Sequence, residues 1–326
     1  MKKILSFFSL KVKNILCSIS LLTVYIHDFW DYNKCNLNGW GDFNQDQLKG
    51  KILLLSHSIE KGMFFPVKKN NWGKKKIFNL YELLQVYIEE YGISKECVSA
   101  FNIISAYNND DFSCKDDDIL NIVAKIRTQY KDYLFDGIGG VKWVSKPNDF
   151  EKNSILYFFS SRASVREFSS LPITEEEIES AMDIAYLTPT ACNRQTSRVY
   201  GIQNKELINL ILSLQLGNQG WCDKANMMFL ITGNISYFGG INERYQVYID
   251  SGLFAMNFVW GLHLNHIASC FKMFVRNYKL QKEIVKYCNI PENEVPIVII
   301  MAGHYKEEAI KDPISYRLRD SYRSIQ

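Results

Sequence analysis

The most constraining feature of the chain is the stretch from Ser161 to Gln195, where two polar turns flank one amphipathic helix. Thr174 and Glu177 have the spacing of a capping box, so the helix begins there, and Pro189 ends it. The apolar residues of this helix recur at helical intervals: Ile178, Met182, Ala185 and Tyr186. Each turn alone is weak evidence. Their order and spacing together are what constrain the fold.

The first turn reads S-R-A-S-V-R-E-F and carries two cations. Arg162, Ser164 and Arg166 alternate, so in an extended or turning backbone their side chains converge on one side. Two guanidinium groups and a hydroxyl form a set that recognises phosphate. The alternative is a solvated surface turn, and the residues alone leave both interpretations open.

The second turn, Thr190 to Gln195, is small and rich in amides, and Arg194 is its only charged residue. Such a composition suits a backbone that closely approaches a flat polar ligand. Asn193 and Gln195 supply hydrogen-bond donors and acceptors there. The alternative is again a plain turn.

Together these turns resemble the FMN-binding opening of the nitroreductase family, S-R-x-S-x-R-x-F followed by a helix and then P-[ST]-x-x-N-x-Q. The resemblance implies that the first turn binds the FMN phosphate and ribityl chain through Arg162, Ala163 and Ser164, with Arg166 near the pyrimidine edge. It also implies a homodimer in which the second turn borders the flavin from the partner subunit, through Pro189, Thr190, Ala191 and Asn193. Thr196 and Ser197 replace the family's Pro-Trp, which alters the outer pocket.

The resemblance implies four further cofactor contacts later in the chain. Asn218, in G-N-Q-G-W, would hydrogen-bond the isoalloxazine ring, although a plain glycine turn is an equal alternative. The backbone amides of Met273 and Phe274 would face the flavin N5 and O4. Arg317, in K-D-P-I-S-Y-R-L-R, would close over the phosphate.

The function implied is that of an FMN-dependent oxidoreductase that uses NAD(P)H to reduce a small organic acceptor by a ping-pong mechanism. FMN carries this chemistry, so no catalytic side chain or metal is required. The sequence has no dinucleotide-binding motif of the Rossmann kind, because G-I-G-G at 137–140 is not followed by a suitable helix pattern. NAD(P)H would therefore bind transiently as a substrate and would not be a permanently bound cofactor. Two alternatives stay open: flavin-dependent oxidation of a specialised metabolite, and a non-catalytic partner of a glycan-assembly complex.

Composition narrows the class of protein. A net charge of +3 over 326 residues gives no basis for nucleic-acid binding. The eight cysteines are scattered without a C-x-x-C pair, which favours free thiols in the cytoplasm. His263 and His266 have no third ligand at a suitable spacing, so we predict no metal site.

Residues 1–40 are predicted to form an amphipathic helix. Its apolar positions recur at roughly helical intervals: Ile4, Phe8, Ile15, Ile19, Leu22, Ile26 and Phe29. The weakly polar run from Ile15 to Ile26 is about half the ~20 residues that a membrane span requires. We expect the apolar face to pack on the protein. The alternative is contact of residues 1–30 with a membrane surface, which would make the protein peripheral to the membrane.

Residues 41–148 are predicted to be a helical accessory region that ends in the glycine-rich segment 136–148. We expect helices at Gln45–Gly62, Lys75–Tyr91, Ser94–Tyr107 and Asp116–Leu134. His57, Glu60 and Lys61 form an H-x-x-E-K-G motif that resembles the leader of a long nitroreductase-like subgroup, some of whose members are associated with cell-surface polysaccharide synthesis. A structural contact is favoured over acid–base chemistry for these residues.

Residues 149–326 are predicted to be the FMN-binding domain, so the fold class is α+β: a nitroreductase-like, antiparallel-leaning sheet wrapped by helices and preceded by the all-helical region. Strands are expected at 198–203, 226–232, 267–274 and 294–305. The other helices are expected at 150–161, 205–216, 243–264 and 279–288.

Overall fold

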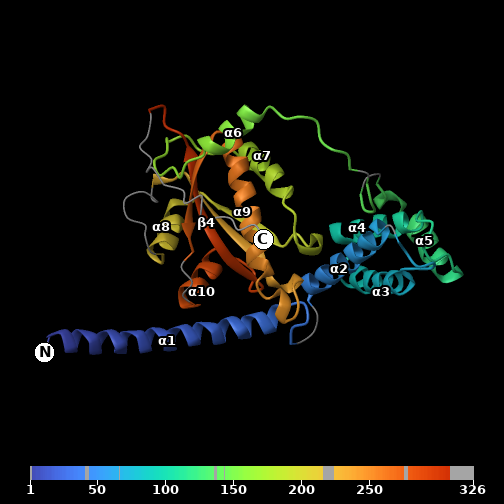
Figure 1. Ribbon diagram of the computed structural model, residues 1–326, viewed down its shortest axis with the longest axis horizontal. Coiled ribbons are helices and arrows are strands. Elements are labelled where there is room, and N and C mark those ends of the chain that lie inside the picture. Colours follow the sequence, from blue (N-terminus) through green and yellow to red (C-terminus); the bar gives the residue numbers. More distant parts are fainter. Residues whose placement is uncertain are drawn as a thin grey trace, which may run out of the picture.

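The computed structural model describes residues 2–40, 44–65, 67–135, 138–142, 144–215, 224–274 and 278–308. It consists of three parts in chain order (Figure 1): a long projecting helix, a cluster of helices, and an α+β part. The long helix is α1 (Lys2–Cys35). The three parts follow the predicted order of an amphipathic helix, an all-helical region and a sheet wrapped by helices.

The second part, called the helical region below, has four α-helices with a core of their own. Asn44, Ser94 and Asp116 cap three of these helices through their side chains. The helices are α2 (Gln45–Phe64), α3 (Lys74–Tyr91), α4 (Lys95–Tyr107) and α5 (Asp117–Gln129), followed by a 3-10 turn at Lys131–Tyr133. One buried cluster of apolar side chains joins them.

Two predicted helix ends in this region were wrong. The helix predicted to stop at Gly62 runs to Phe64, because Gly62 faces the ring of Trp72, which lies 2.1 Å from where a Cβ would stand. This glycine therefore admits a close contact and is not a helix terminator. The helix predicted through Leu134 ends at Gln129, and the next residue, Tyr130, stacks on Phe101 with ring centroids 4.2 Å apart.

A four-stranded antiparallel sheet forms the centre of the third part, in the order β1-β2-β4-β3. Its strands are β1 (Ser197–Ile202), β2 (Met227–Asn234), β3 (Ile267–Met273) and β4 (Glu294–His304). All eight residues of β2 are buried, as its continuous apolar run predicts for a central strand. The predicted antiparallel sheet is confirmed.

Helices cover both faces of the sheet (Figure 1). On one face pack α7 (Glu175–Tyr186) and α9 (Gln246–Leu264), and on the other α8 (Lys205–Ser213) and α10 (Tyr278–Tyr287). The capping box of Thr174 and Glu177 is present at the start of α7. Close packing of α7 and α9 requires Gly261, since a Cβ there would lie 2.4 Å from the carbonyl oxygen of Ala181.

The remaining helical elements of the third part are short. In the described ranges they include α6 (Lys152–Ser161) and 3-10 turns at Ala191–Asn193, Ile235–Tyr237 and Ile241–Glu243. The helix predicted from Glu243 therefore begins three residues later, at Gln246, because Glu243 belongs to a 3-10 turn.

Polar contacts tie the helical region to the sheet. Asp46, in the first turn of α2, accepts hydrogen bonds from the side chains of Asn234 (2.8 Å) and Asn293 (2.7 Å). Gly50 of α2 approaches Tyr237 so closely that a Cβ would lie 2.9 Å from the Tyr237 Cα. These contacts fix α2 against the 3-10 turn at Ile235–Tyr237.

The apolar face of α1 does not pack on the described part of the chain, so the prediction that it does was wrong. Ile15, Ile19, Leu22 and Phe29 are each more than half exposed. The helix projects from the body instead (Figure 1). No described helix is both long and apolar enough to cross a membrane.

Candidate functional site

The first polar turn, residues 161–166, is called the cationic turn below. It leaves the end of α6 in extended conformation, and the Val165 N–H donates to the Ser269 carbonyl of edge strand β3 at 3.1 Å. Ala163 and Val165 pack on the core under the sheet. Because side chains alternate along extended backbone, Ser164 and Arg166 lie on the other side.

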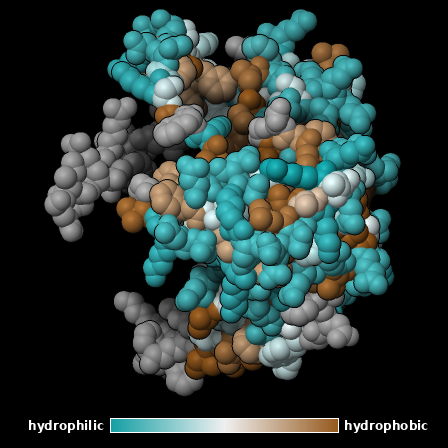
Figure 2. All heavy atoms as spheres, turned by 90° about the vertical axis from the view of Figure 1, so that its right-hand side faces the viewer, coloured by the Kyte–Doolittle hydropathy of each residue, from teal (hydrophilic) through white to brown (hydrophobic). Residues whose placement is uncertain are grey.

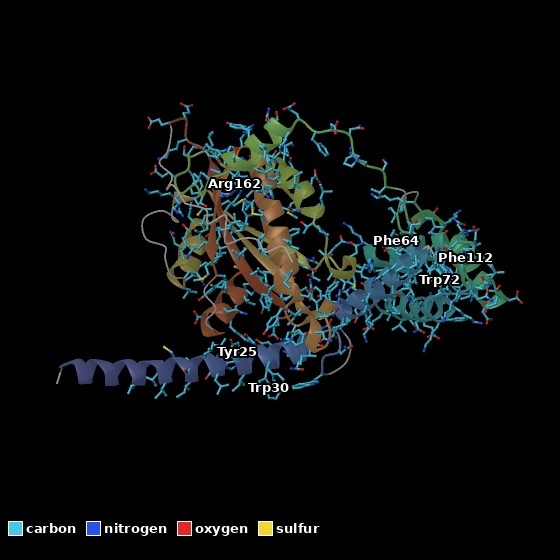
Figure 3. All side chains as sticks on the ribbon, in the orientation of Figure 1. Tyr25, Trp30, Phe64, Trp72, Phe112 and Arg162 are labelled. Carbon is cyan, nitrogen blue, oxygen red and sulfur yellow. The ribbon has the colours of Figure 1, made fainter. Side chains whose placement is uncertain are left out.

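Arg162 lies at the end of α9. The Ser161 hydroxyl and His263 Nε2 are 2.9 Å apart, and burial together with the Arg162 charge lowers the pKa of His263. Arg162 is partly buried, whereas Arg166 is exposed and donates to the Ser164 carbonyl at 3.1 Å. Figure 3 shows Arg162 at the upper end of the sheet, away from Phe64, Trp72 and Phe112 of the helical region.

The later predicted contacts fall partly on the same edge of the sheet. Met273 ends β3, four residues beyond Ser269, and is 74% exposed, whereas the side chain of Phe274 is buried. Strand spacing of about 3.3 Å per residue puts Met273 roughly 13 Å from the contact with the cationic turn. Asn218 and Arg317 lie outside the described residues.

The second polar turn, residues 189–195, is called the strained loop below. Cys192, Asn193 and Gln195 have φ values of 54°, 53° and 51°, the left-handed region that non-glycine residues rarely adopt. Such residues persist where surrounding contacts hold them, and they concentrate at functional sites. The Ala191 N–H donates to Asp250 Oδ2 at 2.9 Å, and the Gln195 N–H donates to the Thr190 hydroxyl at 3.1 Å.

The conformation of Cys192 leads to a stability prediction. Replacing Cys192 by valine should lower the free energy of unfolding by about 1–2 kcal/mol, because a β-branched residue is disfavoured at positive φ. Replacing it by glycine should not lower the free energy, since glycine adopts this region freely. Urea denaturation of the three proteins tests this, and equal losses in both variants would show that the strain is not what matters at this position.

Arg194 anchors the strained loop from beneath. Its side chain is 1% exposed and forms a two-pronged ion pair with Glu243, with Nη1–Oε2 at 3.0 Å and Nη2–Oε1 at 2.7 Å. The guanidinium also donates to the carbonyls of Ala191 (3.0 Å) and Tyr237 (2.9 Å) and lies over the Phe238 ring. The loop's only charged residue therefore serves to hold its backbone.

The same pair gives the loop a dependence on pH. The hydrogen bonds from Arg194 lower the pKa of Glu243 from its ordinary 4.5. A carboxylate with a lowered pKa stabilises the fold above its unfolded pKa, and this contribution is lost as the pH falls through the folded pKa. The stability difference between wild type and Glu243→Gln should thus be full at neutral pH and shrink below about pH 4.5. A difference that stays constant to pH 3 in urea titrations would contradict this.

Within one copy of the chain the two turns lie at opposite ends of α9. The strained loop contacts Asp250 near the start of this helix, whereas the cationic turn contacts His263 near its end. These positions are 13 residues apart, or roughly 20 Å at about 1.5 Å per residue. Pro189 and Asn193 are exposed and directed away from their own chain's core. The two turns therefore do not converge in one copy of the chain.

A cavity of about 480 Å³ lies between the strained loop and the helical region. Thr190 and Gln195 line it from the loop, and Lys95 and Glu96 line it from α4. Its other walls combine apolar and polar side chains: Leu53, Ser99, Met182, Tyr186, Arg198, Val199 and Phe254. The lining is about as polar as it is apolar, and the volume falls in the range of small-molecule sites.

His57 and Glu60 are neighbours on one face of α2. His57 Nδ1 lies 3.6 Å from Glu60 Oε2, and burial raises the pKa of Glu60 even though His57 and the Gly140 N–H lower it. Gly140 lies beside α4, since a Cβ there would stand 3.0 Å from the Cβ of Ala106. In the residues that the structure describes, no three His, Cys, Asp or Glu side chains are grouped as metal ligands.

The sequence interpretation missed three contributors to this region. Two sequence features could have pointed to Arg194 and Asp250. Arg194 is the single charged residue of its loop, and Asp250 is a single aspartate in an otherwise apolar helix. Their partners could not be read from the sequence, since Glu243 and Ala191 lie 49 and 59 residues away. The contribution of Lys95 to the cavity wall could not be predicted either, because it depends on the packing of α4 beside the strained loop.

The model of the nitroreductase family matches residues 159–216, which include the cationic turn, α7, the strained loop and β1. The comparison with curated proteins gave no match.

Several solved structures are similar to the C-terminal half of the chain. A nitroreductase family protein from Streptococcus pneumoniae is 19% identical over 53% of this chain and 100% of its own, with a TM-score of 0.45. An FMN-dependent nitroreductase from Clostridium difficile is 18% identical over 51% of this chain and 93% of its own, with a TM-score of 0.42. The chain is thus similar to the nitroreductase family over residues 159–216, the sequence that forms the two turns.

Proposed function

We propose that the protein is a homodimeric, FMN-dependent oxidoreductase that uses NAD(P)H to reduce a small organic acceptor in two alternating half-reactions. Residues 149–326 form the FMN-binding unit in this proposal, and residues 41–148 form an accessory unit beside it. The separate apolar cores of the helical region and of the sheet support this division. FMN, when bound, supplies the hydride chemistry.

The cationic turn is the observation that carries the proposal. Packing of Ala163 and Val165 on the core leaves Ser164 and Arg166 on the outer side of the edge strand, with Arg162 beside the end of α9. Guanidinium and hydroxyl donors of this kind fit a phosphate, because charge-assisted hydrogen bonds replace the water that a dianion loses. Arg166 would stabilise negative charge on the pyrimidine side of the ring.

The strained loop supports the sharing of each flavin between two copies of the chain. It lies roughly 20 Å from the cationic turn along α9, at about 1.5 Å per residue. Its left-handed residues and buried Arg194 hold exposed Pro189 and Asn193 in one conformation. We infer that these residues border the flavin held by the cationic turn of the partner subunit, with Thr190 and Ala191 behind them.

The cavity beside the loop is the proposed acceptor site. The helical region contributes Lys95, Glu96 and Ser99 to its wall, and the contacts of Asp46 hold that region in place. This placement favours a role of the helical region in acceptor binding over a separate docking role in glycan assembly. The mixed lining also favours an acceptor that carries both apolar and polar groups.

Filling this cavity should impair only the second half-reaction. Ser99→Trp should raise the KM for an acceptor such as menadione at least about tenfold, because loss of ~1.4 kcal/mol of binding is a factor of ten. FMN content and the rate of flavin reduction by NAD(P)H should not change. Val86→Trp, at an exposed position of α3, is the matched control. An unchanged KM in Ser99→Trp would place the acceptor elsewhere.

The proposed function itself is tested by absorption spectroscopy of the purified protein. We expect a flavin spectrum, released FMN close to one per chain, and bleaching when NADH or NADPH is added without oxygen. A protein that is colourless after incubation with FMN would contradict the proposal. A bound flavin that neither nucleotide reduces would favour the alternative, flavin-dependent oxidation of a metabolite.

A further inference from the structure

The last turns of α1 attach to the body through one side of the helix. Asp31 lies 3.9 Å from Lys282 of α10, and Lys34 lies 2.7 Å from Glu292 before β4. The Tyr32 hydroxyl donates to the Gly240 carbonyl at 2.8 Å, and Cys35 is buried against Phe238. This mostly polar side of α1 is therefore the one turned toward the protein.

The apolar side of α1 faces away from these contacts. Ile15, Ile19, Leu22, Ile26 and Phe29 follow one another at three- or four-residue intervals, which places them on one face of the helix. Each of them is 48–60% exposed. Val12, Leu16 and Trp30 widen the same face, which extends for roughly 27 Å at about 1.5 Å per residue.

Aromatic side chains gather where α1 meets the body. Phe29, Trp30 and Trp40 form a cluster with ring centroids 5.2–6.2 Å apart, and both tryptophans are more than half exposed. Figure 3 shows Tyr25 and Trp30 on the projecting helix, and Figure 2 shows hydrophobic atoms at the level of α1 below a mainly hydrophilic helical region. Tryptophan and tyrosine favour the boundary between lipid and water.

The charge of the helix specifies the kind of partner. The first acidic residue of the chain is Asp28. Residues 1–27 contain four lysines, Lys2, Lys3, Lys11 and Lys13, so their side chains carry a formal charge of +4. A basic helix with one apolar face matches a surface that is both apolar and anionic.

We propose that α1 lies in the plane of an anionic membrane surface, with its apolar face among the acyl chains. The C-terminal end of α1 then holds the body at the membrane through the contacts of Asp31, Lys34 and Cys35. The inference is independent of the flavin chemistry, because none of these residues belongs to either turn.

Sedimentation of the full-length protein with lipid vesicles tests the proposal. Vesicles that contain phosphatidylglycerol should bind wild type at least about tenfold more tightly than pure phosphatidylcholine vesicles, and 1 M salt should remove the difference by screening. Leu22→Glu combined with Ile26→Glu should weaken binding about tenfold or more, since the substitutions place charge on the inserted face. Lys11→Gln with Lys13→Gln should reduce the preference for anionic lipid.

Ser20→Glu is the matched control, because two residues are about 200° apart on a helix and Ser20 therefore lies opposite Leu22. It should weaken vesicle binding much less than the double variant, because it adds a single negative charge outside the inserted face. Circular dichroism and the assembly state of each variant, measured without lipid, complete the comparison. The proposal fails if wild type does not bind either vesicle. It also fails if Leu22→Glu changes the assembly state without lipid, which would assign the apolar face to a second copy of the chain.

Discussion

Simultaneous replacement of Arg162 and Ser164 by alanine is expected to weaken FMN binding at least about a hundredfold. Each hydrogen bond to a charged group contributes about 1.5–3 kcal/mol, and about 1.4 kcal/mol is a factor of ten in the dissociation constant. The loss should be large because the two residues supply a cation and a hydroxyl on the outer side of the edge strand. Fluorescence titration of the protein, stripped of its flavin, with FMN measures the effect.

The fold should survive this substitution, since neither side chain belongs to a buried apolar cluster. Arg127→Ala is the matched control: it removes an arginine that hydrogen-bonds Ser105 on the helical region, and FMN affinity should not change. Arg162→Lys should recover part of the affinity, because it keeps the charge and loses the planar fork. A double variant that binds FMN within threefold of wild type, a change of about 0.7 kcal/mol, would remove the cationic turn from the site.

Arg194→Ala is expected to produce the largest loss of stability, roughly 3–4 kcal/mol. Removing one partner of a buried ion pair strands the other partner, here Glu243, and also leaves the Tyr237 and Ala191 carbonyls without their donor. Because the Glu243 side chain is 32% exposed, water limits the effect to the lower part of the usual range. The midpoint of urea denaturation should fall while its slope stays unchanged.

Two further variants separate the fork from the charge. Arg194→Lys should still lose much of the stability, because a lysine cannot form the two-pronged contact with Glu243. Arg244→Ala, at an exposed position in the same segment, should change stability by less than about 0.5 kcal/mol. If Arg194→Ala unfolds at the wild-type urea concentration, the clamp is not what holds the strained loop.

Local patterns in the sequence were sufficient to predict most elements of the fold. The capping box at Thr174 predicted the start of α7, and the continuous apolar run predicted the buried strand β2. Periodicity also predicted α1, because the apolar positions recur along a helix whatever they contact. What α1 packs against depends on tertiary contacts. The favoured outcome, packing on the protein, was wrong.

The site could be predicted only as two separate turns. Spacing predicted that the side chains of Arg162, Ser164 and Arg166 lie on one side of an extended or turning backbone. The distance between the turns, the left-handed conformation of Cys192, and the pairing of Arg194 with Glu243 depend on residues far apart in the chain. Gly62 shows the same limit, since the ring of Trp72 that it accommodates is absent from any local pattern.

The central claim, that one flavin is held by the cationic turn of one copy and the strained loop of the other, is tested most directly by mixing two defective chains. One chain carries Arg162→Ala with Ser164→Ala, and the other carries Pro189→Trp, which places a large side chain at an exposed position of the loop. Each variant alone should bind little FMN. When equal amounts of the two chains pair at random, half of the dimers contain one chain of each kind. In such a mixed dimer one of the two FMN sites is intact. The flavin content should therefore recover to about a quarter of wild type. Recovery to this level would support a site shared between two copies of the chain. If the two chains, coexpressed, bind no more FMN than either variant alone, the shared site is contradicted.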